Sequence, residues 1–311
     1  MKVLVTGGAG FIGSNLADAF LAEGHEVRVL DDLSTGFAEN VPDRAELIEG
    51  GVADRDIVVK AVDGADLVVH LAAHRAVLRS VEDPLATDEA NTHGTLTVLK
   101  SAADARVRRV IYASSSSVYG MNPPMPTPET APARPLSPYG VTKLAGEHYC
   151  RVFAELYGVE TVSFRYFNVF GPRQRPDSAY AAVIPLFIEA LRDGDQPVVH
   201  GDGLQSRAFT FIDDVVAANL AAVAAPASAC AGQVYNIASD ESHTLLDLLD
   251  VLGRTLGVTP APRHVAPRAG DIRNSRADIS AARAALGYEP KVGFEDGLRR
   301  AVAWFEARAG A

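Results

Sequence analysis

The stretch "KVLVTGGAGFIGS", residues 2–14, joins a β-branched run to a glycine-rich turn and the start of a helical pattern. Gly8, Gly10 and Gly13 have the spacing G-x-G-x-x-G, and Gly7, Gly10 and Gly13 follow one another at equal spacing. Such a turn between a strand and a helix lets the backbone approach a pyrophosphate and points N–H groups at it. The stretch therefore predicts a dinucleotide-binding loop.

An acidic pair, Asp31 and Asp32, closes the next predicted strand, residues 26–32. An acid at this strand end can accept hydrogen bonds from both hydroxyls of an adenosine ribose, and it repels a 2′-phosphate. We therefore expect NAD rather than NADP. A plain glycine turn with solvated aspartates is the alternative interpretation.

Beyond this unit, short β-branched runs alternate with longer segments of helical period. This order predicts an α/β fold: a Rossmann-type doubly wound parallel sheet in residues 1–170, followed mainly by a smaller α/β substrate lobe in residues 171–311. Later segments can return to the first domain. The predicted strands are residues 2–7, 26–32, 65–73, 108–115 and 160–167, and the predicted helices are residues 11–22, 85–103, 139–156, 183–194, 245–257 and 293–307.

The composition excludes several classes of protein. The chain has 311 residues and a formal net charge of -10, which argues against a general binder of nucleic acids or anionic membranes. Its two cysteines, Cys150 and Cys230, are too few for a disulfide scaffold. Because the sequence shows neither a secretory signal nor a membrane span, we expect a cytoplasmic protein.

A second motif, "SPYGVTK", places Tyr139 and Lys143 on one face at the start of a predicted helix. A phenol with a pKa of about 10 is a poor base at neutral pH, but an adjacent ammonium and the positive ring of NAD⁺ favour the phenolate. One strand earlier, four consecutive serines, residues 114–117, end a buried strand. Together these residues predict acid–base chemistry beside the dinucleotide.

With these motifs the chain resembles the extended short-chain dehydrogenase/reductase family, in particular its nucleotide-sugar epimerases. The resemblance covers nearly the whole chain, and several independent motifs occur in the right order. They are "TGGAGFIGS" (6–14), "HLAA" (70–73), "SSSVYG" (115–120), "YGVTK" (139–143), "RYFNVFGPRQ" (165–174), "GDGLQSRAFTFIDDVV" (201–216) and "PRAGDIRNSRADISAARAALGY" (267–288).

The resemblance implies roles for individual residues. Tyr139 is the implied acid–base residue, Lys143 supports it and holds the nicotinamide ribose, and Ser115 bonds the sugar 4-oxygen. Ser116 and Ser117 stand where the 4,6-dehydratases of the family carry an Asp-Glu pair, and two serines cannot supply the proton transfers that eliminate water. The implied ligands are a tightly bound, recycled NAD⁺ and a UDP-sugar.

The remaining implied contacts divide between cofactor and substrate. The cofactor residues are Gly7, Gly10, Phe11, Ile12, Gly13, Asp31, Asp32, Val52, Leu71, Ala72, Ala73 and Lys143. The substrate residues are Ser115, Ser116, Ser117, Tyr139, Asn168, Arg175, Arg207, Arg268, Asp271 and Ser275.

The chain departs from the family pattern at two positions. Gly51 stands where the family has an aspartate on the adenine amine, so adenine recognition must use backbone atoms of Val52 or another acid such as Asp54. Ala208 replaces an aspartate beside Arg207, which leaves the local support of that arginine in question.

Two histidines and two further polar residues accompany the "HLAA" motif. His70 and His74 could suggest a metal pair, yet no third ligand with metal spacing follows, so we expect no metal site. Arg75 and Asn91 are expected near the nicotinamide.

The sugar is open among three candidates. Ser275 stands where relatives limited to plain hexoses carry a bulky aromatic residue, so an N-acetyl group at C2 can fit. Arg175 and the serine run would suit the carboxylate of UDP-glucuronate, although uronate epimerases have threonine where Asn168 stands. We expect UDP-glucose/UDP-galactose first, with UDP-GlcNAc/GalNAc and UDP-glucuronate as alternatives.

Other functions on this fold are remoter alternatives: a decarboxylase, a 4-keto reductase or a non-catalytic NAD sensor. Helices 85–103 and 139–156 resemble the helices that pair in family dimers, although their apolar faces could equally be buried against the sheet. We therefore expect a homodimer.

Overall fold

A seven-stranded sheet forms the centre of the molecule in the computed structural model, which describes residues 1–75, 77–175, 182–267 and 272–309. The strand order is β3-β2-β1-β4-β5-β6-β11, and all neighbouring strands are parallel. This is the order of a doubly wound sheet, so the expected Rossmann-type fold class is confirmed. The strands are β1 (Lys2–Thr6), β2 (Glu26–Asp31), β3 (Glu46–Glu49), β4 (Leu67–His70), β5 (Arg109–Ser115), β6 (Glu160–Tyr166) and β11 (Gln233–Ile237).

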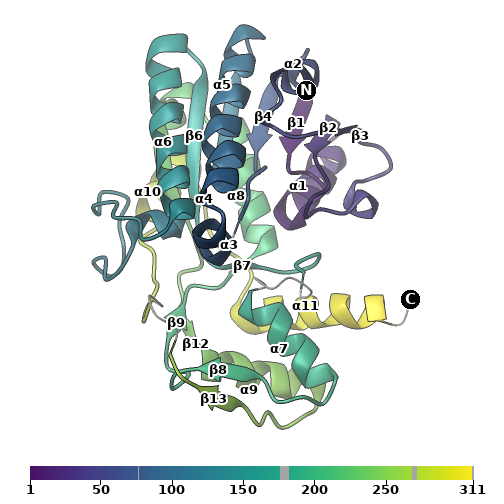
Figure 1. The fold of residues 1–311 in the computed structure, drawn as a ribbon, viewed down its shortest axis with the longest axis vertical. Helices are drawn as coiled ribbons and strands as arrows, with labels where there is room; N and C mark the ends of the chain where they lie inside the picture. Colours follow the sequence, from purple (N-terminus) through teal and green to yellow (C-terminus); the bar gives the residue numbers. More distant parts are fainter. Residues whose placement is uncertain (76, 176–181, 268–271, 310–311) are drawn as a thin grey trace.

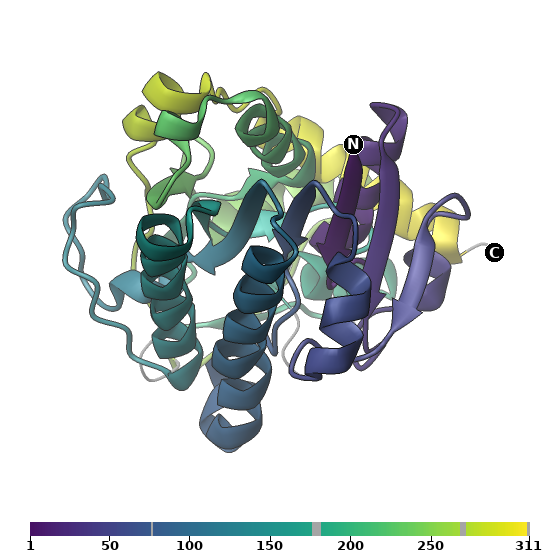
Figure 2. The ribbon, with the colours of Figure 1, turned by 90° about the horizontal axis from the view of Figure 1, so that it is seen from above.

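Both faces of the sheet are buried, which explains the continuous apolar runs of its strands. Val3 and Val5 of β1 pack in one core with Phe20, whereas Leu4 packs in a second core with Val98. Helices α1 and α8 cover the first face, and α2, α5 and α6 cover the second (Figure 2). Their bounds are α1 (Phe11–Ala22), α2 (Arg55–Val62), α5 (Gly94–Asp104), α6 (Pro138–Tyr157) and α8 (Ile212–Ala224).

The helix expected over residues 85–103 is not continuous. After α3 (Val77–Glu82), the chain forms α4 (Pro84–Asp88), a π-helical turn (Glu89–His93) and then α5. Asn91 in that turn is buried; its Oδ1 accepts from the His74 N–H at 2.7 Å and its Nδ2 donates to the Thr142 hydroxyl at 3.0 Å. The widened turn therefore ties the loop after β4 to α6, and such turns are frequent at functional sites.

The C-terminal lobe lies against the carboxyl ends of the strands (Figure 1). Its helices are α7 (Val183–Arg192), α9 (Leu245–Leu256) and α11 (Phe294–Ala309), and its paired strands are β8 (Val198–His200) with β13 (Arg263–Val265) and β9 (Ser206–Arg207) with β12 (His243–Thr244). The remaining strands and α-helix among the described residues are the pair β7 (Val169–Phe170) and β10 (Thr210–Phe211) and helix α10 (Ser280–Leu286). The division of the chain at residue 170 stays a prediction. Among the described residues, no helix is long and apolar enough to cross a membrane.

Candidate active site

A cavity of about 530 Å³ opens where the central strands end and the C-terminal lobe begins. Thr6 of β1 lies opposite Leu30 of β2 and His70 of β4, so three strands end side by side at the cavity wall. Most of the predicted site residues line it: Gly7, Gly10, Phe11, Ile12, Gly13, Asp31, Asp32, Val52, Leu71, Ala72, Ala73, Ser115, Tyr139, Lys143, Asn168 and Arg175.

The glycine loop packs too closely for side chains. Gly7 has a φ of 71°, and a Cβ there would lie 2.7 Å from the Ala72 nitrogen. A Cβ on Gly13 would lie 2.2 Å from the Gly7 carbonyl oxygen. No side chain caps the start of α1 at Gly10, and the first residues of the helix line the cavity, which is the arrangement that binds a pyrophosphate.

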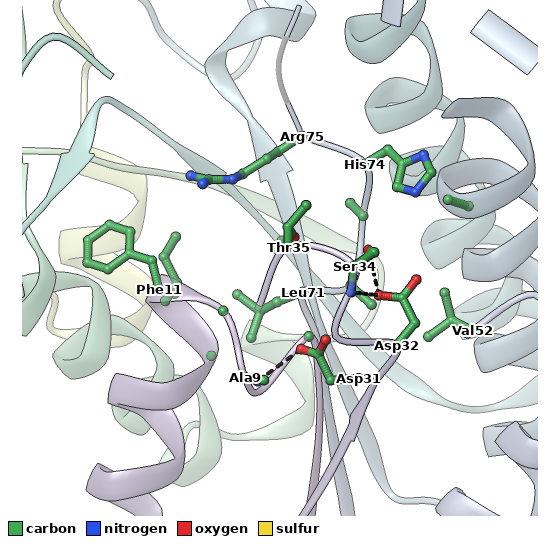
Figure 3. A pocket seen from close by; sticks show the side chains of 18 of the residues that line it. Ala9, Phe11, Asp31, Asp32, Ser34, Thr35, Val52, Leu71, His74 and Arg75 are labelled. Carbon is green, nitrogen blue, oxygen red and sulfur yellow. Dashed lines mark hydrogen bonds between the residues drawn. The ribbon is translucent and has the colours of Figure 1, made fainter. Parts of the chain in front are cut away.

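The acidic pair at the end of β2, Asp31 and Asp32, also shapes this loop (Figure 3). Asp31 is buried; its Oδ2 accepts from the Ala9 N–H and its Oδ1 from the Leu33 N–H, each at 2.9 Å. Burial raises the pKa of the Asp31 carboxyl, and the two backbone hydrogen bonds oppose that rise. Asp32 is exposed and accepts from the Ser34 N–H at 2.9 Å and from its hydroxyl at 2.6 Å.

At one end of the cavity the wall is backbone and small apolar side chains, from Gly50 to Ala53. Asp54, the acid considered for adenine, does not line the cavity among its described residues. Its Oδ1 instead accepts from the N–H groups of Asp56 and Ile57 and caps α2. Of the two residues proposed for adenine recognition, Val52 therefore lines the cavity and Asp54 does not.

Tyr139 and Lys143 enter the cavity from the first turns of α6. Ser137 caps this helix, because its hydroxyl accepts from the Gly140 N–H at 3.1 Å. The Lys143 Nζ donates to the Ala113 carbonyl at 2.8 Å and lies 5.8 Å from the centroid of the Tyr139 ring. Both residues are thereby held against the end of β5.

Burial sets the ionisation of this pair. It lowers the pKa of Lys143 to about 8, and it raises the pKa of Tyr139 above its ordinary value. A hydrogen bond with Ser115 and the charge of Arg75 act on Tyr139 in the opposite direction. The pKa of Tyr139 is therefore raised, whereas the neighbouring ammonium was expected to lower it. Burial removes the phenolate from water, and this effect is larger than those of Ser115 and Arg75.

The four serines have different surroundings. Ser114 is buried and donates to the Glu147 Oε1 at 2.5 Å. Ser115 lines the cavity and also accepts from the Ser117 N–H at 3.2 Å, which caps the 3-10 turn Ser116–Tyr119. Neither Ser116 nor Ser117 lines this cavity, and the Ser117 Oγ is buried without a hydrogen-bond partner. The structure thus brings only Ser115 of the predicted substrate serines to the cavity.

A second cavity, of about 610 Å³, adjoins the first and lies in the C-terminal lobe. Asn168, Val169 and Gln174 line both cavities, so the two meet at this segment. Arg207 lines the second cavity only. Its Nη1 donates to the Ser206 carbonyl at 2.9 Å and so holds the guanidinium beside its own strand.

The other predicted substrate residues within the described chain do not line the second cavity. Arg175 faces the cofactor loop: its Nη1 donates to the Thr35 carbonyl at 3.0 Å, and its guanidinium lies 4.3 Å from the centroid of the Phe37 ring. Ser275 lies outside the described lining of both cavities, in a segment bonded to Ser206 and Ala208. Arg268 and Asp271 lie outside the described residues.

The histidines do not form a metal site in the part of the chain that the structure describes. His70 is buried between the hydroxyls of Thr6, at 2.7 Å, and Thr95, at 3.0 Å, and burial lowers its pKa to about 3. His74 lines the cavity, and its Nε2 lies 3.4 Å from the Arg79 guanidinium.

Sequence reasoning missed several residues of the cavity wall. Thr35, Phe37 and Asn40 follow the acidic pair in the stretch "LSTGFAEN", residues 33–40, where turn residues after a strand end were the available signal. Figure 3 shows Ser34 beside the Asp32 carboxylate and Thr35 on the side of Leu71 that faces Arg75. Tyr166, at the end of β6, also lines the cavity.

Comparison with known proteins agrees with this geometry. Residues 3–238 match the NAD dependent epimerase/dehydratase family. A UDP-glucose 4-epimerase of Mycolicibacterium smegmatis is 39% identical over 99% of this chain and 100% of its own length. The sequence resemblance to nucleotide-sugar epimerases is therefore confirmed.

Solved structures agree as well. The UDP-glucose 4-epimerase of Thermotoga maritima, solved with UDP-glucose, has a TM-score of 0.95 and 36% identity, covering 99% of this chain and 100% of its own. The Thermus thermophilus UDP-glucose 4-epimerase, solved with NAD, has a TM-score of 0.90 and 36% identity, covering 98% of this chain and 99% of its own. The chain belongs to the NAD dependent epimerase/dehydratase family, and its cofactor is NAD.

Proposed function

We propose that this enzyme is a UDP-sugar 4-epimerase that acts through a transient 4-keto sugar. The observation that carries the proposal is the grouping of Ser115, Tyr139 and Lys143 in the wall of the cofactor cavity, which adjoins a second cavity. The 4-epimerase relatives and their bound UDP-glucose and NAD support it.

The first cavity fits a dinucleotide. The Gly13 position leaves no room for a side chain, the start of α1 is open to an anion, and Asp31 can accept from a ribose hydroxyl. When bound, NAD⁺ would supply a hydride acceptor that is regenerated within each turnover, and its positive ring would favour a phenolate nearby. Lys143 would hold its ribose, because the ammonium is fixed by the Ala113 carbonyl at the cavity wall.

Tyr139 moves the proton. As a phenolate it accepts the proton of the C4 hydroxyl while the C4–H bond breaks, leaving a C4=O double bond. Ser115 donates a hydrogen bond to O4 and so steadies the oxygen through both steps. After the 4-keto sugar turns its other face to the cofactor, the C4–H bond re-forms and Tyr139 returns the proton. Ser116 and Ser117 carry no carboxyl group, which disfavours elimination of water.

The second cavity is the proposed site of the UDP group. Arg207 would contact a phosphate with its planar donors, and Asn168 lies where the two cavities meet. Arg268 and Asp271 are proposed nucleotide contacts from the family resemblance alone. Binding energy from the diphosphate would anchor the substrate while the sugar turns.

Among the sugars, UDP-glucose and UDP-galactose rank first. UDP-GlcNAc and UDP-GalNAc are a second candidate pair from the family resemblance, because the small Ser275 would admit an N-acetyl group; Ser275 lies outside the described lining of both cavities. Ser116 and Ser117 would contact the sugar only if they turn toward it, and Arg175 bonds to Thr35, so the structure offers less support for UDP-glucuronate.

We also propose a homodimer. Several large apolar side chains on α4 and α6 are exposed: Leu85 by 82%, Val141 by 53% and Leu156 by 76%. Helix faces of this kind suit pairing with a second copy. Light scattering of the purified protein would give twice the mass of the chain, whereas the mass of one chain would contradict the proposal.

The test of function is to incubate the purified protein, without added cofactor, separately with UDP-glucose, UDP-GlcNAc and UDP-glucuronate. Proton NMR should show the C4 epimer of at least one, approaching equilibrium. Tyr139→Phe should lose most of this activity while retaining bound NAD. Three unchanged sugars, even after NAD⁺ is added, would contradict the proposal for these substrates.

A further inference from the structure

Helix α6 presents a ladder of three residues, one turn apart, to the end of β5. Tyr139 lies near Ser115, which acts to lower the pKa of the Tyr139 phenol, and Lys143 donates to the Ala113 carbonyl at 2.8 Å. One turn further on, Glu147 accepts from the Ser114 hydroxyl at 2.5 Å. The same helix face therefore contacts three consecutive residues of the strand end.

The third residue of the ladder, Glu147, is buried, and Arg165 pairs with its carboxylate. The Glu147 side chain is only 4% exposed and lies outside the described lining of both cavities. Arg165 of β6 donates to it twice, from Nε to Oε1 at 2.9 Å and from Nη2 to Oε2 at 2.7 Å. A two-point arginine–carboxylate contact fixes direction as well as distance, so Glu147 is held from β5 and β6 together.

The same arginine connects the ladder to the rest of the molecule. Its Nη1 donates to the Glu129 carbonyl at 3.1 Å, and the Glu129 Oε1 accepts from the Asn236 N–H at 2.8 Å. The Asn236 amide in turn donates to the Thr127 carbonyl at 2.9 Å and the Asp278 carbonyl at 3.0 Å. Strand β11 and the segment around residue 278 are thus braced against the carboxylate that holds Ser114.

We propose that Glu147 is a positioning residue, which holds Ser114 through its carboxylate and so aligns the neighbouring Ser115 with Tyr139. This inference rests on the function proposed above for Ser115 and Tyr139. Ser114 and Ser115 share a peptide unit, so a shift of one moves the other. A misplacement of about 1 Å at reacting groups can cost on the order of 100-fold in rate.

The mildest test is Ser114→Ala, which removes one hydroxyl and leaves the Glu147–Arg165 pair in place. We expect kcat to fall by about 10- to 100-fold with KM for the UDP-sugar nearly unchanged, and NAD content and thermal midpoint close to wild type. Ser163→Ala is the matched control, because it removes a buried hydroxyl of β6 that bonds to neither Glu147 nor Arg165. It should leave kcat unchanged.

Glu147→Gln is the second variant, since an amide cannot accept from Arg165 at both ends. It should lower kcat at least as much as Ser114→Ala, with some loss of thermal stability. Combining Ser114→Ala with Glu147→Gln should lower kcat little further than Glu147→Gln alone, because both substitutions disrupt the same Glu147–Ser114 contact. A loss in Ser163→Ala as large as in Ser114→Ala would overturn the proposal.

A readout without substrate separates this proposal from the proposed function. Ultraviolet titration, with Tyr139→Phe subtracted, gives the pKa of Tyr139, which the Ser115 hydrogen bond lowers. Ser114→Ala should raise that pKa. If wild type epimerises none of the sugars, the proposed function fails. The change in the Tyr139 pKa caused by Ser114→Ala still tests whether Glu147 positions Ser115. If neither kcat nor the Tyr139 pKa changes, Glu147 does not position the pair.

Discussion

Gly13→Ala should weaken NAD binding with little damage to the rest of the fold. The added Cβ would lie 2.2 Å from the Gly7 oxygen and 2.7 Å from the Gly8 Cα. Because Cβ contacts under 3.0 Å essentially never occur, the first turn of α1 must move away from the glycine loop by about 0.8 Å. Both elements line the cofactor cavity, so this movement acts directly on the pyrophosphate site.

The size of the effect follows from the packing. Forcing an extra methyl group into a close-packed contact costs about 1–3 kcal/mol, which is about 5- to 150-fold in an equilibrium constant. In a helix, alanine is favoured over glycine by about 1 kcal/mol, which offsets part of the cost in the unfolding equilibrium. We therefore expect a larger loss in NAD affinity than in unfolding free energy.

The assay is calorimetric titration of the NAD-stripped protein with NAD⁺, together with the NAD content retained through purification. Gly293→Ala is the control away from the site, because a Cβ at that position meets nothing within 4 Å. Wild-type affinity in Gly13→Ala would refute the steric reasoning. An equal loss in Gly293→Ala would show that the effect is not specific to the loop.

Three further predictions concern buried polar groups. Arg109 is 1% exposed and donates to Glu160 and to carbonyls in the last turn of α8. Arg109→Met should therefore lower the unfolding free energy, measured in urea, by about 3–5 kcal/mol, whereas Arg108→Met at an exposed position should lower it by less than about 1 kcal/mol. His70 has a folded pKa of about 3 against 6.5 ordinarily, so below neutral pH the unfolded chain binds a proton that the folded chain does not, and wild-type stability falls as the pH falls there. His70→Phe should therefore cost about 1–3 kcal/mol in urea denaturation at neutral pH and less at mildly acidic pH; a cost that grows toward acidic pH would contradict this. The folded pKa of Lys143 is about 8 against 10.5 ordinarily, so the unfolded chain binds more protons in that window and wild-type stability rises with pH there. In urea denaturation of NAD-stripped protein, Lys143→Met should be more stable than wild type at neutral pH. The difference in unfolding free energy between the two should shrink as the pH rises from about 8 to 10.5. A difference that stays constant or grows would contradict the lowered pKa of Lys143.

The elements that could be predicted are those whose signals are local. The helix expected over residues 11–22 has those bounds in the structure, because glycines precede it and an apolar face runs along it. The π-helical turn Glu89–His93 could not be predicted, since it depends on contacts from Asn91 to His74 and Thr142, far away in the chain. The helical pattern in the sequence reflects only the spacing of apolar residues, and one widened turn hardly changes that spacing.

Strand β11 illustrates the same limit in the sheet. Gln233–Ile237 pairs with β6, beyond a long stretch that builds much of the C-terminal lobe. A strand this short has a weak local signal, and its partner is decided by tertiary packing. The sequence could predict only that later segments can return to the first domain.

Site residues could be predicted where a motif fixes the position of the backbone. They were harder to predict where the direction of a long side chain depends on its neighbours in the folded protein. The cofactor residues named from the sequence line the cavity because glycines and strand ends set their positions. Arg175 was expected near the sugar but lies on Phe37, at the loop after the acidic pair. A long side chain can reach several groups, so its neighbours depend on loops that meet only in the folded molecule.

The serine run shows how neighbours in the sequence acquire separate roles. A strand directs successive side chains to opposite faces, and the 3-10 turn after Ser115 changes their direction again. Spacing could predict that hydroxyls gather at the end of β5, but the partner of Ser114 is an acid 33 residues further on, and its counter-charge lies in the next strand. The chemistry proposed at Ser115 therefore depends on a buried pair, Glu147 and Arg165, that the motif itself does not contain.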